Sequence, residues 1–449
     1  MDALELSRLQ FALTIAFHYI FPPLSIGMSL VLVFMEAQYL RTRDELYSKL
    51  TRFWVKIFGL VFSLGVASGI VMEFQFGTNW STYSRYVGDV FGSALAAEGI
   101  FAFFLESGFL AILLFGWNRV KPRTHFISTL MVCLGSHFSA VWIVVANSWQ
   151  QTPAGFHIVT AGSGERAEIV NFWQMVFNPS SLDRISHVFM GAWQAGAFFI
   201  LSVSAYYLLK QRHTEYARVS IRFALPLAVI ASLLQLVSGH ASAAGVSRHQ
   251  PAKLAALEGF YPERAPAPLY LFGWVDEKEQ RVRYGVKIPG LLSLLVHGDA
   301  EVPVQGLSSF APEERPPVNI VFQTYHLMIT IGMALIMTAL LGLFYLWRGR
   351  LAAQRWLLWI FVFAVLGPQF ANQAGWMTAE IGRQPYIVYN LLRTSDAFSP
   401  VVSATQIRIS LVLFGIIYTL LFILFIYLLN SKIKTGPEPV ESIAEGQRA

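Results

Sequence analysis

The stretch GWMTAEIGRQPY, residues 375–386, closes an apolar run long enough to cross a membrane, yet it carries two opposite charges. Glu380 and Arg383 are three residues apart, so on a helix they share one face. Charged side chains within the hydrocarbon of a bilayer are energetically costly and tend to mark functional sites. The meaning of this pair therefore depends on whether other ionisable residues lie at the same depth.

The composition of the whole chain predicts an integral membrane protein. Of its 449 residues, 55% are hydrophobic and only 13% are charged, whereas a soluble domain carries about 25% charged residues. The net charge of +6 then reflects how basic residues are distributed among loops, and it indicates no nucleic-acid partner. A single cysteine, Cys133, excludes a disulfide or a cysteine-held iron–sulfur cluster within the chain. The first residues do not have the pattern of a cleaved signal peptide.

Nine segments are apolar over the roughly 20 residues that a helix needs to cross the hydrocarbon core. We therefore predict an all-α membrane protein with nine transmembrane helices, at residues 11–37, 54–76, 94–117, 125–147, 186–209, 220–240, 319–347, 355–380 and 405–430. The chain then divides into helices 1–6 (1–240), a long loop (241–318), helices 7–9 (319–430) and a tail (431–449).

Lysine and arginine are concentrated in alternate connections between these helices. One side of the predicted bundle carries 16 basic residues: Arg41, Arg43, Lys49, Arg52, Arg119, Lys121, Arg123, Lys210, Arg212, Arg218, Arg222, Arg348, Arg350, Arg355, Lys432 and Lys434. The short connections of the other side carry five: Arg85, Arg166, Arg184, Arg383 and Arg393. Because the side richer in basic residues faces the cytoplasm, we predict the N-terminus outside and the C-terminus in the cytoplasm.

The connection 241–318 departs from the pattern of short loops. It is punctuated by proline and glycine, is rich in charge and is predicted to face outside. A connection of this length without an obvious fold of its own is usually functional or disordered. We therefore expect either a binding function or disorder in this segment.

Ligand-type side chains converge within the predicted spans. Counting 1.5 Å per residue from the span ends, we place residues of five helices in one layer near the outer face: His18, Glu98, His187, His326 with Met328, and Glu380. Glu106 lies eight residues beyond Glu98, about 12 Å nearer the cytoplasm and about 80° around the helix. The other ionisable residues within spans are interpreted as paired, solvated or packed groups: Glu36, Glu73 and His137.

The chemistry of these side chains suits haem iron, which accepts His, Met and occasionally oxygen ligands. A His187–Met328 pair would fill both axial positions and suit electron transfer, whereas a single His or Glu ligand would leave one position open. A carboxylate such as Glu106, remote from bulk water, can become protonated and relay protons. Each feature also has a plainer interpretation: a helix cap for His187, packing for Met328, or an interfacial ion pair for Glu380 and Arg383.

Several motifs together resemble subunit I of the cytochrome bd-type quinol oxidases, and the resemblance covers almost the whole chain. The motifs are MEFQFGTNWS (72–81), AEGIFAFFLES (97–107), AVWIVVANSWQ (140–150), KLAALE (253–258) and GWMTAEIGRQP (375–385). The long loop resembles the short form of the family's Q-loop. Two positions depart from the family pattern: His326 stands where some members have Arg, and Tyr386 where Trp often follows.

The resemblance implies three haems: two haem b, one low-spin and one high-spin, and one haem d or a third haem b. By position, His187 and Met328 would ligate the low-spin haem b. His18 and Glu380 would ligate the other two haems, in an order left open. The remaining matches are Glu98 beside the dihaem site, Glu106 on the proton route, Arg383 and Trp376 at the haems, and Lys253 and Glu258 at the quinol site.

The resemblance also implies a function in a respiratory chain of a bacterial cytoplasmic (inner) membrane. Such an oxidase takes electrons from ubiquinol or menaquinol at the outer face and reduces O2 to water with cytoplasmic protons. Charge separation then arises without a pump. The expected partners are a second membrane subunit and small single-span subunits.

Other classes of membrane protein fit the sequence less well. A proton-coupled transporter predicts repeated halves with broken helices, and nine spans divide poorly. A quinone-reactive b-type cytochrome without oxygen chemistry requires two pairs of histidines on two helices, which we do not find. A haem–copper oxidase requires a copper-binding histidine cluster, and the sequence has no adjacent pair of histidines. A scaffold subunit has little reason to gather Glu and His at one depth. The transporter and the b-type cytochrome are kept as alternatives.

Overall fold

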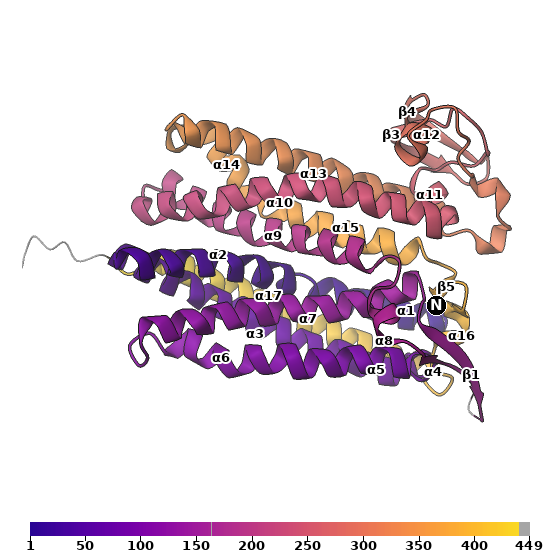
Figure 1. The fold of residues 1–449 in the computed structure, drawn as a ribbon, viewed down its shortest axis with the longest axis horizontal. Coiled ribbons are helices and arrows are strands. Elements are labelled where there is room, and N and C mark those ends of the chain that lie inside the picture. Colours follow the sequence, from indigo (N-terminus) through magenta and orange to yellow (C-terminus); the bar gives the residue numbers. More distant parts are fainter. Residues whose placement is uncertain (163, 440–449) are drawn as a thin grey trace, which may run out of the picture.

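The computed structural model describes residues 1–162 and 164–439, which form a bundle of long helices lying side by side (Figure 1). We call the end with the N-terminus and the strands the loop end, and the opposite end, with residues 436–439, the tail end. Among the described residues, nine helical segments are long and apolar enough to cross a membrane, as predicted: Ala3–Thr42, Glu45–Thr78, Gly88–Phe115, Pro122–Gln151, Ser181–Leu209, Thr214–His249, Pro312–Trp347, Arg355–Ile381 and Ala404–Thr435.

Three of these segments are interrupted within their membrane-length part. Their parts are α1 (Ala3–His18) and α2 (Phe21–Thr42), then α5 (Gly88–Ala97), a π-helix (Glu98–Phe103) and α6 (Phe104–Phe115), and finally α14 (Arg355–Ala364) and α15 (Leu366–Ile381). Proline accounts for two of the breaks, because its ring removes an N–H donor and clashes with the carbonyl four residues earlier. Pro22 and Pro23 open α2, and Pro368 lies four residues after the end of α14. Irregular backbone at membrane depth persists only where protein surrounds it or it lines a cavity.

The other long helices differ from the predicted spans mainly at their ends. They are α3 (Glu45–Thr78), α7 (Pro122–Gln151), α9 (Ser181–Leu209), α10 (Thr214–His249), α13 (Val318–Trp347) and α17 (Ala404–Thr435). Helix α10 continues nine residues into the segment predicted as loop, and α1 begins eight residues earlier than predicted. Of the predicted tail 431–449, residues 431–435 belong to α17, and 440–449 lie outside the described residues.

Short elements complete the chain, and the strands all lie at the loop end (Figure 1). The short helices are α4 (Ser81–Tyr86), α8 (Phe172–Val176), α11 (Pro251–Leu257), α12 (Leu291–His297), α16 (Thr394–Ala397) and the 3-10 turns Leu307–Ser309, Pro312–Glu314 and Leu351–Ala353. Three antiparallel hairpins pair β1 (Phe156–Ala161) with β2 (Gly164–Ile169), β3 (Leu269–Asp276) with β4 (Arg281–Ile288), and β5 (Tyr386–Val388) with β6 (Leu392–Arg393).

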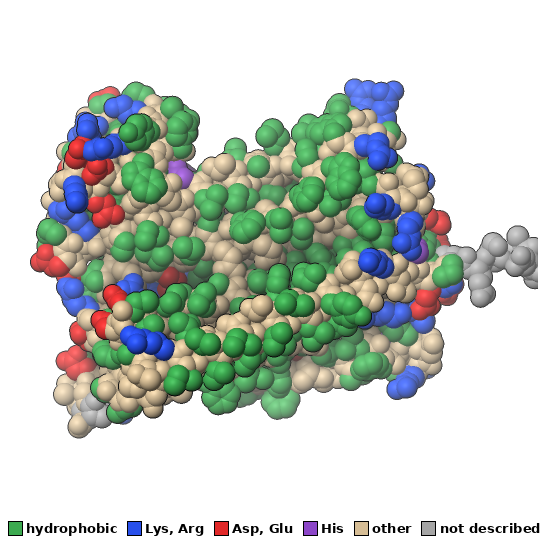
Figure 2. Space-filling view, turned by 180° about the vertical axis from the view of Figure 1, so that it is seen from behind, with side chains coloured by type: hydrophobic (Ala, Val, Ile, Leu, Met, Phe, Trp, Pro, Cys, Tyr) green, Lys and Arg blue, Asp and Glu red, His purple; other side chains and the backbone are tan. Residues whose placement is uncertain are grey.

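Helix α9 is the best-buried span, whereas α17 is mostly exposed. The main core joins α2, α3, α9 and α10 through large buried side chains such as Phe58, Trp54 and Phe198. Exposed apolar side chains cover the middle of the molecule, and charged side chains gather toward its two ends (Figure 2). This distribution is expected for a protein whose middle faces lipid or other membrane subunits.

The long loop is folded, which excludes disorder, one of the two alternatives expected for it, and leaves a binding function as a prediction. It contains α11, the β3–β4 hairpin and α12, and it has a hydrophobic core of its own that continues onto the first turns of α13. Phe260, Leu307 and Phe322 are among the buried members of this core. His326 of α13 attaches the hairpin, because its Nε2 lies 2.8 Å from the carbonyl oxygen of Tyr270.

Candidate functional site

Helix α7 provides a scale of depth, because three of the predicted site carboxylates contact it at different heights. From the tail end to the loop end, the contacts are Glu106 against Gly135, Glu98 with Ser139, and Glu380 with Asn147. At 1.5 Å per residue, the first two contacts are about 6 Å apart along the helix and the last two about 12 Å. The expected single layer is therefore two levels, which we call the outer level, around Glu380, and the inner level, around Glu98 and Glu106.

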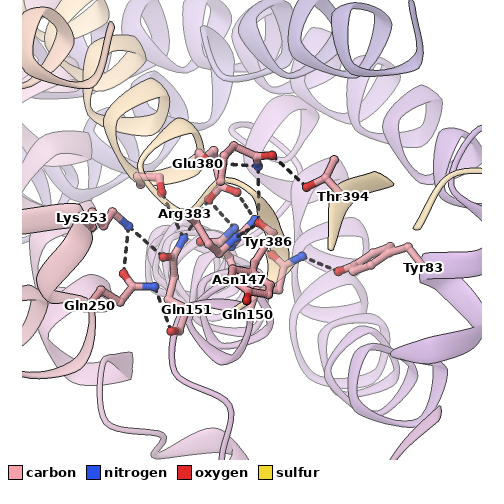
Figure 3. A network of polar contacts seen from close by, with 12 residues as sticks. Tyr83, Asn147, Gln150, Gln151, Gln250, Lys253, Glu380, Arg383, Tyr386 and Thr394 are labelled. Carbon is pink, nitrogen blue, oxygen red and sulfur yellow. Dashed lines mark hydrogen bonds and ion pairs between the residues drawn. The ribbon is translucent and has the colours of Figure 1, made fainter. Parts of the chain in front are cut away.

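The outer level is organised around Glu380, near the end of α15 (Figure 3). One carboxylate oxygen, Oε1, accepts hydrogen bonds from Asn147 Nδ2 at 3.0 Å and from Gln151 Nε2 at 3.3 Å. The other, Oε2, pairs with Arg383 Nη2, as the spacing in the sequence predicts. About a third of the Glu380 side chain (34%) is still accessible, so this network does not fully enclose it.

Two more cations adjoin this carboxylate. Lys253 of α11 is buried and donates from Nζ to Gln151 Oε1 at 2.8 Å and to Gln250 Oε1 at 3.1 Å (Figure 3). The Arg184 guanidinium donates to Asn147 Oδ1 and lies 5.7 Å from the centre of the Trp376 ring. The side-chain amides of Gln151 and Gln250 thus connect the long loop to Glu380.

Arg184 was not singled out from the sequence. The available signal was its position three residues before His187, which places both on one face of α9. Trp376 was predicted to contact a cofactor, and the structure places its ring between Arg184 and Tyr19, whose ring centroid is 5.4 Å away.

The inner level holds His18 and the two carboxylates of the third span. His18 is the last residue of α1, and its Nδ1 lies 3.0 Å from Ser68 Oγ on α3. Because α1 starts at Ala3, His18 lies deeper than the sequence suggested. Ser139 Oγ donates to Glu98 Oε1 at 2.5 Å.

The π-helix at Glu98–Phe103 alters the relation between Glu98 and Glu106. In a regular α-helix they would be about 80° apart, but one extra residue in a π-helical turn removes about 100° and leaves them nearly aligned. Both side chains accordingly face α7. Hydropathy gives no indication of such a turn, and π-helical turns are frequent at functional sites.

His187 and Met328 face different neighbouring helices. Gln235 Nε2 of α10 lies 2.9 Å from His187 Nε2, and Ser238 Oγ lies 3.1 Å from its Nδ1. Met328 on α13 directs its Sδ toward Gly375 of α15. Helices α9, α10, α13 and α15 are packed neighbours. The contacts of His187 and Met328, however, do not bring these two side chains together.

Four of the predicted site side chains lie against a glycine of an adjacent helix. A Cβ added to the glycine would come within 2.5–3.5 Å of the side chain in each case: Gly69 and His18, Gly239 and His187, Gly375 and Met328, Gly135 and Glu106. Glycine permits this close approach because it has no side chain. The neighbouring helices therefore accommodate these ligand-type side chains in close contact.

These residues fit haem in three respects. Imidazole, thioether and carboxylate are groups that ligate haem iron. Glycines face three of the proposed ligands, His18, His187 and Met328, so the neighbouring helices add no side chain of their own at these contacts. Two buried guanidinium atoms, Arg184 Nε and Arg383 Nη1, have no hydrogen-bond partner, and guanidinium groups bind carboxylates such as those of haem.

The predicted quinol residues Lys253 and Glu258 lie at opposite sides of the buried face of α11. Lys253 faces the Glu380 network, and burial lowers its pKa well below the usual lysine range, assisted by Arg184 and Arg383. Glu258 is 2% exposed, and its Oε2 has no partner. Burial raises the pKa of Glu258 to about 8, and a hydrogen bond with Tyr325 partly offsets this rise.

Of the remaining ionisable residues, Glu36 and His137 are packed or paired, whereas the Glu73 side chain is exposed. Glu36 is buried and bonded to His125, with Nδ1 to Oε1 at 2.6 Å. His137 accepts a hydrogen bond from Trp193 Nε1 at 3.0 Å, as expected for a core histidine. Tyr386, which departs from the family pattern, still makes an aromatic contact, because the Arg393 guanidinium lies 5.3 Å from its ring centre.

Comparisons with known proteins agree with the sequence motifs. The family model described as "Cytochrome bd terminal oxidase subunit I" matches residues 6–437. The chain is 38% identical to "Cytochrome bd ubiquinol oxidase subunit 1" of Bacillus subtilis, covering 98% of this chain and 95% of the relative. It is 35% identical to "Cytochrome bd-II ubiquinol oxidase subunit 1" of Escherichia coli, with 98% of each covered. The solved bd oxidase from Geobacillus thermodenitrificans superposes with a TM-score of 0.89 at 29% identity, over 97% of this chain and 99% of that one.

Proposed function

This chain belongs to the cytochrome bd terminal oxidase subunit I family, and from that premise we propose which of its residues carry out the reaction. It is a multi-pass membrane subunit of a quinol:oxygen oxidoreductase. When bound, the haems supply electron transfer and the site of oxygen reduction. The observation that carries the proposal is that His18, His187 and Met328 each lie against a glycine of a neighbouring helix, in a chain of this family.

His187 and Met328 would hold the low-spin haem b, which would supply electron transfer at this position. The pair requires a porphyrin between α9 and α13, and Gln235 and Ser238, now bonded to the His187 ring, lie beside that position. A ligated imidazole keeps one nitrogen free, and a hydrogen bond to that nitrogen fixes its orientation. Ser238, bonded to Nδ1, can do this while Nε2 binds iron.

His18 and Glu380 hold the other two haems, a high-spin haem b and haem d or a third haem b. Their different levels support this assignment. Gln373, seven residues or about 10 Å before Glu380 on α15, donates to the carbonyl oxygen of Ala16 near the end of α1, so His18 lies deeper in the bundle than Glu380. Arg383 pairs with Glu380 and offers its free Nη1 to a haem carboxylate. Trp376, one turn before Glu380 on the same helix, packs beside this site.

Quinol is bound and oxidised at the loop end, near α11. Glu258 accepts a proton as the quinol loses its electrons, because its buried carboxyl group can be either neutral or ionised near physiological pH. Lys253 connects this loop to the haem site through Gln151. The quinol is ubiquinol or menaquinol.

Protons for water formation move along α7, from Glu106 to Glu98. The π-helix aligns both carboxylates with this helix, and Ser139 orients Glu98. With the N-terminus outside, these protons come from the cytoplasm, and those of the quinol leave on the other side. The reaction is then electrogenic without a pump, because the two proton exchanges occur on opposite faces.

The exposed apolar belt provides the surface for lipid and for the other subunits (Figure 2). We propose a second membrane subunit, with small single-span subunits, in a bacterial inner membrane. Family membership favours this oxidase over the proton-coupled transporter and over the b-type cytochrome without oxygen chemistry.

The test is to purify the complex with its second subunit and record dithionite-reduced spectra, haem content and oxygen consumption with quinol. The proposal expects three haems per complex and quinol-dependent oxygen consumption. A spectrum with haem b alone and no oxygen consumption would support the b-type cytochrome. The absence of haem would remove the proposal altogether.

A further inference from the structure

The position of Arg184 connects the residues proposed to hold two different haems. It lies three residues before His187 on α9, and its guanidinium donates to Asn147, which itself donates to Glu380. The ring of Trp376, which belongs to the same sequence motif as Glu380, lies 5.7 Å from this guanidinium. Arg184 thus contacts the surroundings of Glu380 and lies within one helical turn of His187.

The buried charges around Glu380 do not balance. Arg383, Arg184 and Lys253 all act on this one carboxylate. The other hydrogen-bond partners in the network are neutral, namely Asn147, Gln150, Gln151, Gln250, Gln384 and Thr394. The neighbouring carboxylate of Asp183 is directed elsewhere, toward Gly245 on α10. Even with a neutral lysine, two guanidinium groups that cannot lose their protons face one carboxylate.

An uncompensated buried charge is strongly destabilising, so this cluster requires additional anions. The two arginines also have unused donors, because Arg184 Nε and Arg383 Nη1 are buried without partners. A guanidinium group binds a carboxylate through a fork of two parallel N–H groups. Carboxylates that approach from the haem sites would supply such anions.

Lys253 is less suited to this task than Arg184. Its ammonium group is already bonded to two amide oxygens, those of Gln151 and Gln250. The Arg184 guanidinium, in contrast, lies near the ring of Trp376, and such a cation–π contact restricts the orientation of its planar fork.

Resting on the proposed haem ligation, we propose that Arg184 binds carboxylate groups of two haems, the one held by His187 and the one held by Glu380. Arg184 is then a positioning residue between the two haems. Its positive charge also favours the reduced form of each iron, because reduction adds an electron nearby.

The experiment is redox titration of the purified complex, with each haem followed by its optical spectrum. We expect Arg184→Gln to lower the midpoint potentials of the low-spin haem and of the Glu380-held haem, and to affect the His18-held haem least. Arg184→Lys keeps the charge but loses the fork, and its two potentials should fall between those of the wild type and Arg184→Gln. Arg393→Gln removes a positive charge at the same end of the bundle, outside the network, and should leave the potentials unchanged.

The outcomes separate this inference from the proposed function. A wild-type complex without haem would remove the proposed function itself. A wild-type complex with three haems, but with both potentials unchanged in Arg184→Gln, would overturn only the role of Arg184. A shift in one potential alone would overturn its contact with two haems. If Arg184→Gln does not assemble, Arg184→Lys decides, because the proposal requires both of its potentials to shift.

Discussion

The outer and inner levels of the bundle differ in how they surround a carboxylate. At the outer level, Glu380 is bonded to Asn147, Gln151 and Arg383, in a network that continues into the loop. At the inner level, Glu98 accepts a hydrogen bond from the Ser139 hydroxyl, and the Cγ of Glu106 packs against Gly135. A densely bonded carboxylate is held in one position and suits ligation. A sparsely bonded one is free to gain and lose a proton.

The largest effect is expected from a substitution at the outer level. Glu380→Ala removes a proposed iron ligand and leaves Arg383 unpaired, so we expect loss of one haem and an activity loss well above the roughly 10- to 100-fold typical of outer-shell changes. Haem content and oxygen consumption are the measurements. Glu314→Ala, which removes the carboxylate partner of Arg393, is the control, and retained haem content in Glu380→Ala would contradict the assignment.

A change at the inner level should separate proton delivery from haem binding. Glu106→Gln cannot release a proton, and we expect oxygen consumption to fall by about 100-fold, since positioned acid–base groups contribute at least this much. The haem spectrum should be retained, in contrast to Glu380→Ala. Ser107→Ala, whose exposed hydroxyl binds only its own helix, serves as the control. Equal loss of haem in Glu106→Gln and Glu380→Ala would contradict the assignment of haem binding to the outer level and proton delivery to the inner level.

Glu258 gives a pH dependence at the loop end. Its pKa is raised to about 8, so at lower pH the carboxyl group is neutral and cannot accept a proton from quinol. We expect quinol oxidation to increase by up to about tenfold from pH 7 to pH 9, as the ionised fraction rises. The measurement is the steady-state rate against pH, and Glu258→Gln should lose this rise.

Glu263→Gln is the matched control for this pH profile, because Glu263 is an exposed loop carboxylate that bonds only Ser309. It should keep the rise. An unchanged profile in Glu258→Gln would show that another group accepts the proton.

The smallest expected effect concerns the attachment of the hairpin. His326→Ala removes the bond to the Tyr270 carbonyl, a contribution of about 0.5–1.5 kcal/mol. Amide hydrogen exchange should become faster in Leu269–Asp276, while the haem spectrum stays the same. Unchanged exchange in this strand would indicate that the Gln323 bond to the Gly273 carbonyl is sufficient to hold it.

The sequence was sufficient to predict the number of spans and to nominate most of the candidate site residues, for identifiable reasons. Nine apolar runs persist even where the helices break, because hydropathy averages over the one or two residues of a break. Charge in an apolar segment is conspicuous, so Glu98, Glu106 and Glu380 were found, and the motifs supplied their family.

The remaining features depend on geometry that hydropathy does not record. The depth of His18 was misjudged because α1 begins at Ala3, ahead of the apolar run. The π-helix after Ala97 has the composition of an ordinary span. Arg184 was counted only as a loop charge, since its contact with Trp376 joins α9 to α15 across the fold.

The central claim is that side chains from separate helices bind haem iron, and Met328 tests it most directly. Met328→Leu keeps the volume but removes the sulfur ligand, and Met333→Leu, in an exposed position on the same helix, is the matched control. The account predicts that electron paramagnetic resonance of oxidised Met328→Leu shows the low-spin haem signal converted to high spin, with Met333→Leu unchanged. A full low-spin signal in Met328→Leu would contradict it.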